Sequence, residues 1–379
     1  MAEVFAGELC GTDGFRRPVA IKRILPALAD QPAFQRLFVR EARLGALLDH
    51  PNIVAVLDFD RDENGRPYLI MERIQGVDVH ALMVTGPVPL AASVTIVASV
   101  LRALTHAHAL CDAGQPLGVL HRDISPKNIM LAWSGTVKLV DFGVARPVTA
   151  ARPSLVGTTH SLIGVGARGK VGYMSPEQVH GVELDGRSDV FSAGVVFHEL
   201  LTGTPLFADA SPERTVELLL RKKVAAPNAL DPRVPAGLSD VCMSMLARDR
   251  NRRIASARAA LAAVLEQSRG LDTSDGDLCA LLTERFSARA RENASWTGSF
   301  VSDRPVPQAR SLVMTGAPQS ATADAQAMAA HTRTMPGSRA PDMRPRTPLD
   351  RVQTRAWAWI GGALVTAFVL IALAWLMTR

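Results

Sequence analysis

Apolar and polar residues alternate in RPVAIKRIL, residues 17–25, near the start of the chain. A period of two predicts a β-strand that places Lys22 on the same face as Ala20. Residues 32–54 instead repeat their apolar side chains at helical spacing, with Glu41 inside the apolar stripe. Because burying an unpaired charge is strongly unfavourable, Glu41 needs a basic partner, and Lys22 is the natural candidate. Taken alone, such a pair is more often structural than catalytic.

Strand-like and helix-like segments alternate over residues 1–268 without an obvious repeat, which predicts one globular body. Within it, residues 187–203, RSDVFSAGVVFHELLTG, are apolar on most sides and predict a helix buried in the centre of a domain. Residues 277–286, DLCALLTERF, predict a short amphipathic helix. We therefore expect a helical extension over residues 269–300 that packs on the end of the body.

Residues 301–379, about a fifth of the chain, have a different pattern. Residues 301–355 contain repeated prolines and no aromatic residue, which predicts a disordered linker. Residues 356–377 carry no charge and span roughly 33 Å as a helix, enough to cross a hydrocarbon core. Basic residues precede this segment, so we expect a single-pass helix in the cell inner membrane with the body in the cytoplasm. The alternative is a buried core helix.

Composition limits the possible partners. A net charge of +6 and a pI near 9.5 could indicate nucleic acid, but the arginines are scattered and only two tyrosines are present. We expect a solvated basic surface and no nucleic-acid partner. The four cysteines lack CxxC spacing, so neither disulfides nor a zinc site is predicted. The first ten residues have two glutamates and no long apolar core, which predicts no secretory signal.

Candidate chemistry gathers in LHRDISPKNIMLAWSGTVKLVDFG, residues 120–143, where polar groups stand between apolar runs. Carboxylate and amide oxygens of this kind are what Mg²⁺ prefers. HRDISPKN, DFG, VAIK and GYMSPEQ occur in this chain together with Glu41. The ordered set resembles the signature of eukaryotic-type Ser/Thr protein kinases, and its motifs are most similar to those of the bacterial members. The resemblance covers residues 1–268.

The resemblance implies a bilobal α+β fold, with a small β-rich lobe and a larger helical lobe. It also implies ATP and Mg²⁺ as cofactors and transfer of the γ-phosphate to Ser/Thr hydroxyls of protein substrates. By resemblance, Lys22 holds the α- and β-phosphates and Glu41 holds Lys22. Asp123 orients the substrate hydroxyl and accepts its proton, while Asn128 and Asp141 bind the metal.

The same resemblance implies an adenine slot. Val4, Ala20 and Met130 would form its walls, and Ala20 is small on the face where a flat base must lie close. Met71 and Glu72, in the segment YLIMERI, would form the hinge.

Other family positions imply structural roles. His121 and Phe142 would be packing residues within their motifs. Asp189 would tie down the catalytic loop, which is the HRDISPKN segment at residues 121–128, and Glu177 would pair with Arg253.

Several positions depart from the family pattern. Ser125 stands where Ser/Thr kinases usually carry the lysine that meets the γ-phosphate, so we expect Lys127 to supply that charge. This placement resembles the basic residue of tyrosine kinases. Lys170 stands where a threonine is usual. Gly45, one helical turn after Glu41, replaces a large apolar residue and predicts a gap beside the helix.

The Gly-rich loop is the largest departure. In the pattern G-x-G-x-x-G-x-V, Val4 fits the last position and Ala2 the third glycine, so the first two glycines and the first strand would precede Met1. We expect translation to begin upstream; otherwise a weak kinase, or a membrane-anchored pseudokinase that binds partners without phosphoryl transfer, is the better interpretation. Without the first strand, the small-lobe sheet exposes an edge.

Regulation by phosphorylation is also implied. Arg122 beside Asp123 can pair with a phosphate on the segment after DFG, so self-phosphorylation within residues 144–172 is expected. The alternative is a merely polar loop. The candidate hydroxyls are those of Thr149, Ser154, Thr158, Thr159 and Ser161.

Overall fold

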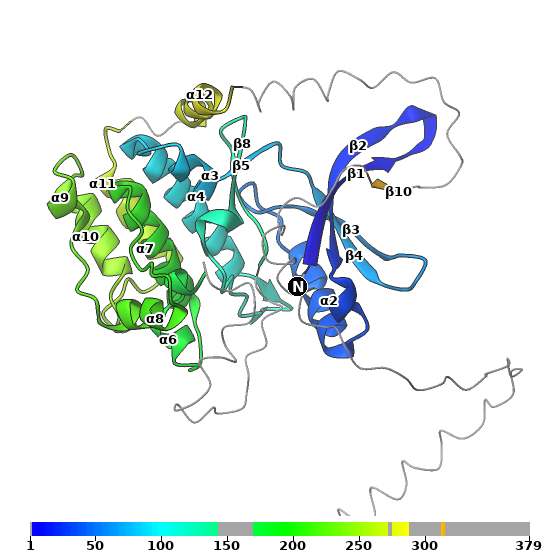
Figure 1. Ribbon diagram of the computed structural model, residues 1–379, viewed down its shortest axis with the longest axis horizontal. Helices are drawn as coiled ribbons and strands as arrows, with labels where there is room; N and C mark the ends of the chain where they lie inside the picture. The colour runs from blue at the N-terminus through cyan, green and yellow to red at the C-terminus, as the bar shows by residue number, and fades with distance from the viewer. Residues whose placement is uncertain (1, 143–169, 272–274, 288–311, 315–379) are drawn as a thin grey trace, which may run out of the picture. The chain divides into compact units, whose positions relative to one another are not determined.

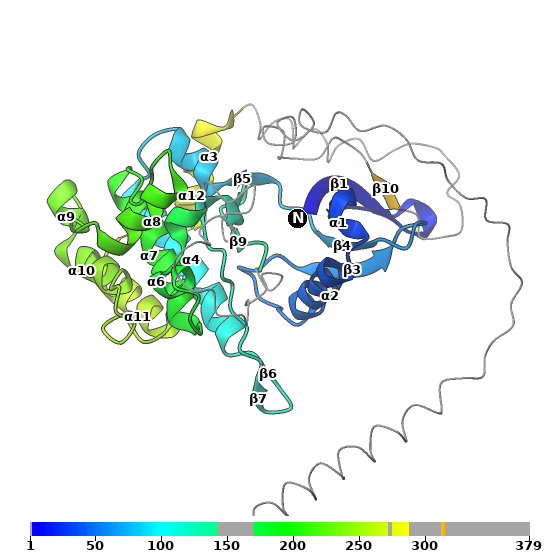
Figure 2. The same cartoon turned by 60° about the horizontal axis from the view of Figure 1, so that its bottom comes forward.

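The structure is a computed structural model that describes residues 2–142, 170–271, 275–287 and 312–314. These residues form one lobe rich in β-strands and one that is mainly helical (Figure 1). In a view turned about the horizontal axis, β1, β3 and β4 again lie apart from helices α4, α7 and α10 (Figure 2). The predicted bilobal α+β architecture is therefore present.

Within the described residues, the small lobe is an antiparallel sheet with the strand order β10-β1-β2-β4-β3. Its elements are β1 Ala2–Cys10, β2 Arg16–Ile24, α1 Pro26–Ala29, α2 Pro32–Ala46, β3 Val56–Arg61, β4 Pro67–Glu72 and β10 Leu312–Met314. The strand predicted around Lys22 is β2, and the helix predicted around Glu41 is α2.

The two faces of β2 pack into different clusters, as its alternating pattern predicts. Val19 and Ile21 pack with Ile70 on one face. On the other face Ala20 packs in a cluster that contains Phe38 of α2. This alternation directs Lys22 toward the face covered by α2.

The large lobe is built around two long buried helices, α4 and α7, which supply many of its core residues. Its helices are α3 Val79–Val84, α4 Leu90–His108, α6 Pro176–Val179, α7 Gly186–Thr202, α8 Pro212–Arg221, α9 Pro227–Leu230, α10 Ala236–Met245, α11 Ala257–Gln267 and α12 Asp275–Arg285. The predicted buried helix is α7, which ends at Gly203 with a positive φ of 68°.

Short strands carry the functional loops of the large lobe. Strand β5 Gly76–Asp78 pairs with β8 Ile129–Ala132, which pairs with β9 Val137–Leu139. A separate hairpin joins β6 Cys111–Asp112 to β7 Gln115–Pro116. Gly76 is required at the β5–β8 crossing, because a Cβ there would lie 1.8 Å from the carbonyl oxygen of Leu131.

One helix of the described residues, α4, is long and apolar enough to cross a membrane by length and composition. Most of its apolar window, 72%, is buried inside the large lobe, so α4 is a core helix. The predicted span 356–377 lies outside the described residues.

The predicted amphipathic helix after the body is α12. Its residues Leu278 and Leu282 are fully buried in the core of the large lobe. The guanidinium of Arg285 donates to the carbonyl oxygens of Pro87 at 2.6 Å and Gly86 at 3.3 Å. Apolar burial and hydrogen bonds thus attach α12 to the loop that precedes α4.

Strand β10 lies within the predicted linker 301–355, and the linker prediction did not anticipate it. It pairs antiparallel with β1, with Gly7 opposite Met314 and Leu9 opposite Leu312. The sheet edge that the sequence predicted to be exposed is therefore covered along this part of β1. The rest of the linker lies outside the described residues.

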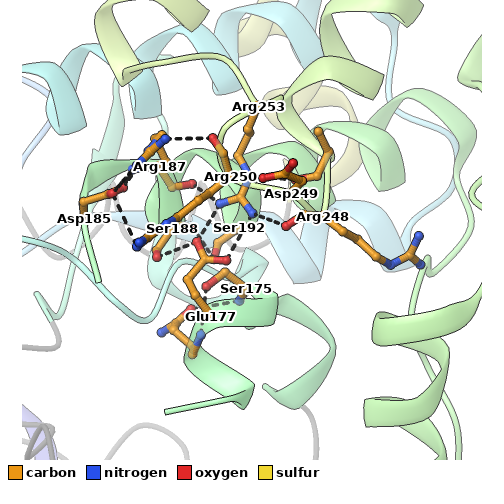
Figure 3. Close-up of polar contacts among 12 residues, drawn as sticks. Ser175, Glu177, Asp185, Arg187, Ser188, Ser192, Arg248, Asp249, Arg250 and Arg253 are labelled. Carbon is orange, nitrogen blue, oxygen red and sulfur yellow. Dashed lines mark hydrogen bonds and ion pairs between the residues drawn. The ribbon is translucent and has the colours of Figure 1, made fainter. Parts of the chain in front are cut away.

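A buried ion pair ties α6 to the loop after α10 (Figure 3). Arg253 donates to both carboxylate oxygens of Glu177, at 2.6 and 3.1 Å, as the sequence predicted. Their side chains are 0% and 6% exposed. Ser188 also donates to Glu177 at 2.7 Å, and Arg253 donates to the carbonyl oxygens of Ala247 and Arg187. The charges are therefore buried with their hydrogen bonds satisfied.

We expect the double substitution Val313→Pro and Met314→Pro to release β10. Adjacent N–H groups of a strand point in opposite directions, so the pair of prolines removes whichever one faces β1. Hydrogen exchange in Gly7–Leu9 should accelerate about tenfold or more in the full chain. The matched control is Ala329→Pro with Ala330→Pro; equal exchange in both variants would show that β10 does not cover this edge.

We expect Glu177→Ala to lower the free energy of unfolding by about 3–5 kcal/mol, because it leaves the Arg253 cation buried alone. Burial by itself would raise the pKa of Glu177, but hydrogen bonds from Arg253 and Ser188 outweigh it and lower the pKa. The stabilisation is therefore present above the ordinary glutamate pKa and is lost as pH falls through the lowered value. Urea unfolding at about pH 7 and about pH 3 measures both effects.

The control for this experiment is Arg214→Ala, which removes the exposed i,i+3 pair between Arg214 and Glu217 on α8. Exposed pairs contribute less than about 1 kcal/mol, so this variant should unfold almost as the parent chain does. Similar losses in the Glu177 and Arg214 variants would contradict the assignment of a stabilising role to the buried pair.

Candidate active site

Lys22 lies at the meeting point of the two lobes. Its Nζ atom is 2.6 Å from Oε1 of Glu41 on α2 and 2.8 Å from Oδ1 of Asp141, which follows β9. The predicted pairing of Lys22 with Glu41 is present, and Asp141 joins it from the large lobe. The alternation along β2 places Lys22 on the face that packs against α2. The helical spacing along α2 places Glu41 on the face that packs against the strand.

The charges of this cluster support one another. Burial by itself would lower the pKa of Lys22, but Asp141 and Glu41 outweigh it and raise the pKa, so the ammonium stays charged. Burial raises the pKa of Glu41, and Lys22 offsets only part of that effect. At Asp141 the opposing effect of Lys22 outweighs burial, and the pKa is lowered. Asp141 is therefore ionised at neutral pH.

The DFG segment holds Asp141 in an unusual backbone conformation. Asp141 has a φ of 58°, in the left-handed region, which costs a non-glycine residue about 1–3 kcal/mol. Beside it, the rings of Phe142 and His121 lie 4.7 Å apart, and both residues are buried. Nε2 of His121 donates to the carbonyl oxygen of Val140 at 3.0 Å. These contacts hold Asp141 in its strained conformation. They match the packing role predicted for His121 and Phe142.

The catalytic loop brings Asp123 and Asn128 together. Nδ2 of Asn128 donates to the backbone oxygen of Asp123 at 2.7 Å and to its Oδ2 at 3.0 Å. The amide oxygen of Asn128 therefore remains as an oxygen ligand for a cation. Lys170 reaches the same pair, with its Nζ 2.7 Å from Oδ2 of Asp123 and 3.5 Å from Oδ1 of Asn128. Sequence reasoning noted Lys170 as unusual but did not place it in the site.

Asp189, in the first turn of α7, fixes the catalytic loop to the core. Its carboxylate accepts the backbone N–H groups of His121 at 2.9 Å and Arg122 at 2.8 Å, the latter with a φ of 63°. Burial would raise the pKa of Asp189, but hydrogen bonds and nearby histidines lower it. His108 of α4 donates to the same carboxylate at 2.8 Å. The position of His108 near the end of a helical segment gives no sequence signal of this distant contact.

The residues predicted to bind adenine lie on three strands. Val4 is the register partner of Lys22, and Ala20 is the partner of Met71, so these positions adjoin the Lys22 cluster. Met130 lies on β8 in the large lobe. Val4, Ala20 and Met130 are each partly exposed.

The predicted hinge residue Glu72 ends β4, and its carboxylate has a structural task. It accepts a hydrogen bond from the backbone N–H of Ala55 at 2.8 Å and forms an ion pair with Lys138. These contacts hold the chain that enters β3 against the end of β4. The backbone N–H of Glu72 is also used, since it donates to the carbonyl oxygen of Ala55 at 2.9 Å.

Two of the departures from the family pattern have clear structural settings. Ser125 is 2% exposed, and its hydroxyl has no hydrogen-bond partner among the described residues. Lys127 lies exposed on the 3-10 turn Pro126–Asn128 and forms no ion pair within the described residues. The expectation that Lys127 supplies the charge beside the γ-phosphate therefore stays a prediction.

The gap predicted at Gly45 is absent. A Cβ at Gly45 would lie 2.7 Å from Cγ2 of Val56, so the side chain of Val56 already fills the space beside α2. The prediction was wrong because the neighbouring strand compensates for the small residue. The missing side chain lets β3 approach the helix that carries Glu41.

The expected phosphorylation sites cannot be placed in this geometry. Thr149, Ser154, Thr158, Thr159 and Ser161 lie outside the described residues. Arg122, the expected phosphate partner, is described, and its Nε atom is buried without a hydrogen-bond partner in the described part of the chain.

Residues 8–265 match the family model described as protein kinase domain. Tyrosine-protein kinase MasK of Myxococcus xanthus is 39% identical over 253 residues, which cover 65% of this chain and 38% of MasK. Serine/threonine-protein kinase PknB of Mycolicibacterium smegmatis is 34% identical over 296 residues, which cover 77% of this chain and 45% of PknB. The chain thus spans less than half the length of these two relatives.

The fold is likewise similar to a solved kinase. A crystal structure of a double mutant of the Mycobacterium tuberculosis PknI kinase domain has a TM-score of 0.52 and 28% sequence identity. The match covers 71% of this chain and 91% of that domain. With the motifs, the two lobes and the Lys22 cluster in place, the chain belongs to the protein kinase family.

Proposed function

We propose that this chain is a protein kinase that transfers the γ-phosphate of ATP to serine and threonine hydroxyls of proteins. The observation that carries the proposal is the convergence of Lys22 with Asp141 across the lobes, at 2.8 Å, over a separation of 119 residues. A cation for phosphate and an acidic metal ligand are thereby placed together.

The donor set fits ATP with Mg²⁺. Asp141 and the amide oxygen of Asn128 would hold the metal, since hard cations take oxygen ligands. Lys22 would hold the α- and β-phosphates, with Glu41 fixing its direction. The metal would neutralise the charge of the phosphate oxygens; the side chains of this chain position the nucleotide and the substrate.

Asp123 would act on the substrate hydroxyl. One of its carboxylate oxygens, Oδ2, is occupied by Asn128 and Lys170, so the orientation of the group is fixed. Its side chain is 13% exposed, which leaves it accessible to a hydroxyl at the mouth of the site. Asp123 would accept the hydroxyl proton as the oxygen attacks the γ-phosphorus.

The hydroxyl type is a separate question, because the relatives include both a tyrosine kinase and Ser/Thr kinases. We favour serine and threonine because GYMSPEQ resembles the Ser/Thr pattern. The feature that resembled tyrosine kinases was Lys127, which is exposed and has no ion-pair partner among the described residues. The rival proposal, a pseudokinase scaffold, predicts nucleotide or partner binding without transfer.

The test uses radiolabelled ATP, Mg²⁺ and a generic protein substrate, followed by separation of the phosphoamino acids. We expect label on serine and threonine, and a loss of about 100-fold or more with Lys22→Met and with Asp123→Asn. Peptide mapping of the same reaction locates self-phosphorylation within residues 144–172. The control is Arg214→Ala on α8. Label that is insensitive to both site substitutions, or no label with the intact chain, contradicts the proposal.

We propose further that residues 356–377 anchor the chain in the inner membrane with the kinase domain in the cytoplasm. The support is the uncharged length of this segment and the basic residues before it. We expect Val365→Asp with Val369→Asp to move the chain from the carbonate-washed membrane fraction to the soluble fraction, because each central charge disfavours insertion by about 2.5–3.5 kcal/mol. Val365→Leu with Val369→Leu is the control, and an unchanged distribution of the aspartate variant would exclude this anchor.

A further inference from the structure

We propose that Lys170 supplies the cation beside the transferred γ-phosphate, in place of the lysine that the family pattern carries where this chain has Ser125. The proposal rests on the proposed kinase function and assigns a catalytic residue from a different segment of the chain. It starts from the ion pair between Lys170 and Asp123, at 2.7 Å.

The position of the ammonium carries the argument. Nζ of Lys170 lies 2.7 Å from Oδ2 of Asp123 and 3.5 Å from Oδ1 of Asn128. Asp123 meets the attacking hydroxyl, and Asn128 meets the metal that binds the phosphate oxygens. The phosphoryl group must pass close to both residues, so a cation in contact with both lies beside its path.

The other lysines of the chain are placed elsewhere. The six lysines all lie within the described residues. Lys22 is held by Glu41 and Asp141, and Lys138 pairs with Glu72. The remaining three are Lys127, which lies exposed on its turn, and Lys222 and Lys223, which follow α8.

Ser125 cannot replace the missing charge. Its side chain is neutral and buried, and the hydroxyl has no partner among the described residues. Without Lys170, Asp123 and Asn128 would lose the ammonium that contacts both of them, at the place where a polyanionic substrate must bind. The Lys170 side chain is 29% exposed, so it can reach a ligand in the slot while it contacts Asp123.

The backbone after Lys170 is held tightly against the large lobe. The 3-10 turn Val171–Tyr173 begins at the next residue, and a Cβ at Gly172 would lie 2.2 Å from the carbonyl oxygen of Phe207. The hydroxyl of Tyr173 donates to Oε2 of Glu199 on α7 at 2.8 Å. The backbone next to Lys170 is therefore held in place. A group that stabilises a transition state needs such preorganisation.

The chemistry requires no additional reactant. The substrate oxygen forms a bond to the γ-phosphorus as its proton passes to Asp123, and the bond from that phosphorus to the β–γ bridging oxygen breaks. The bridging oxygen keeps the electron pair and leaves on ADP. Lys170 contributes a fixed positive charge and N–H donors to the phosphoryl oxygens throughout this step.

The first test locates the lysine chemically, in the full chain. The probe is ATP that carries an acyl group on its γ-phosphate; a nearby lysine amine attacks the carbonyl carbon, forms an amide and releases ATP. We expect mass spectrometry to find the acyl group on Lys170, with protection by excess ATP. Acylation of Lys127 in place of Lys170, or of Lys22 alone, overturns the proposal.

The second test measures nucleotide affinity by calorimetry. Because ADP lacks the γ-phosphate, Lys170→Met should weaken ATP about tenfold or more and change ADP less than about twofold. Lys170→Arg should restore most of the ATP preference, and Lys223→Met is the exposed control. Equal weakening of ATP and ADP by Lys170→Met would indicate a structural role and overturn the proposal.

The two proposals fail in different ways. If the parent chain binds no ATP and no lysine is acylated, the kinase function itself is contradicted. If the parent chain binds ATP and transfers phosphate, but Lys170 is neither acylated nor required for the preference for ATP over ADP, only the assignment of Lys170 is overturned.

Discussion

The ammonium of Lys22 is shared between a carboxylate of the small lobe and one of the large lobe, and this shared charge joins the two halves of the site. Glu41 lies 2.6 Å from it and Asp141 2.8 Å. Burying the charges of Lys22 and Glu41 without partners would be strongly unfavourable, and Asp141, whose side chain is 40% exposed, supplies the second carboxylate to Lys22. The requirement orients α2 against β2 and draws the DFG segment toward the cleft. A strained φ at Asp141 is tolerated because this contact and the buried Phe142 hold it.

A second set of buried charges holds the other side of the site. Asp189 accepts two backbone N–H groups of the catalytic loop from the first turn of α7, the most completely buried long helix of the large lobe. Glu177 and Arg253 fix α6 in the same region, and Gln178 donates to the carbonyl oxygen of Arg122 at 2.9 Å. The loop residues proposed to act on substrate are therefore positioned by helices. Such support gives a loop the precision that catalysis requires.

The sequence predicted the parts of this arrangement that depend on local period and on motif. Alternation around Lys22 and helical spacing around Glu41 determine which way each side chain points, so their contact could be inferred from the pattern of residues alone. Contacts between distant segments gave no such signal, as for His108 with Asp189. The gap expected at Gly45 was wrong because the sequence does not reveal which neighbour fills a small residue's space. Strand β10 was missed because pairing with a sheet edge requires little of the added sequence.

The position of Lys170 changes how the charges of the site are assembled. In the family pattern, the catalytic loop carries both the carboxylate that receives the proton and the lysine that meets the phosphate. Here Asp123 comes from that loop, whereas the cation comes from the residue before the turn Val171–Tyr173. That turn is held by Tyr173 on Glu199 of α7. It follows that Lys170 reaches Asp123 only when the turn is docked on α7. Docking of this segment and assembly of the charges of the site therefore occur together.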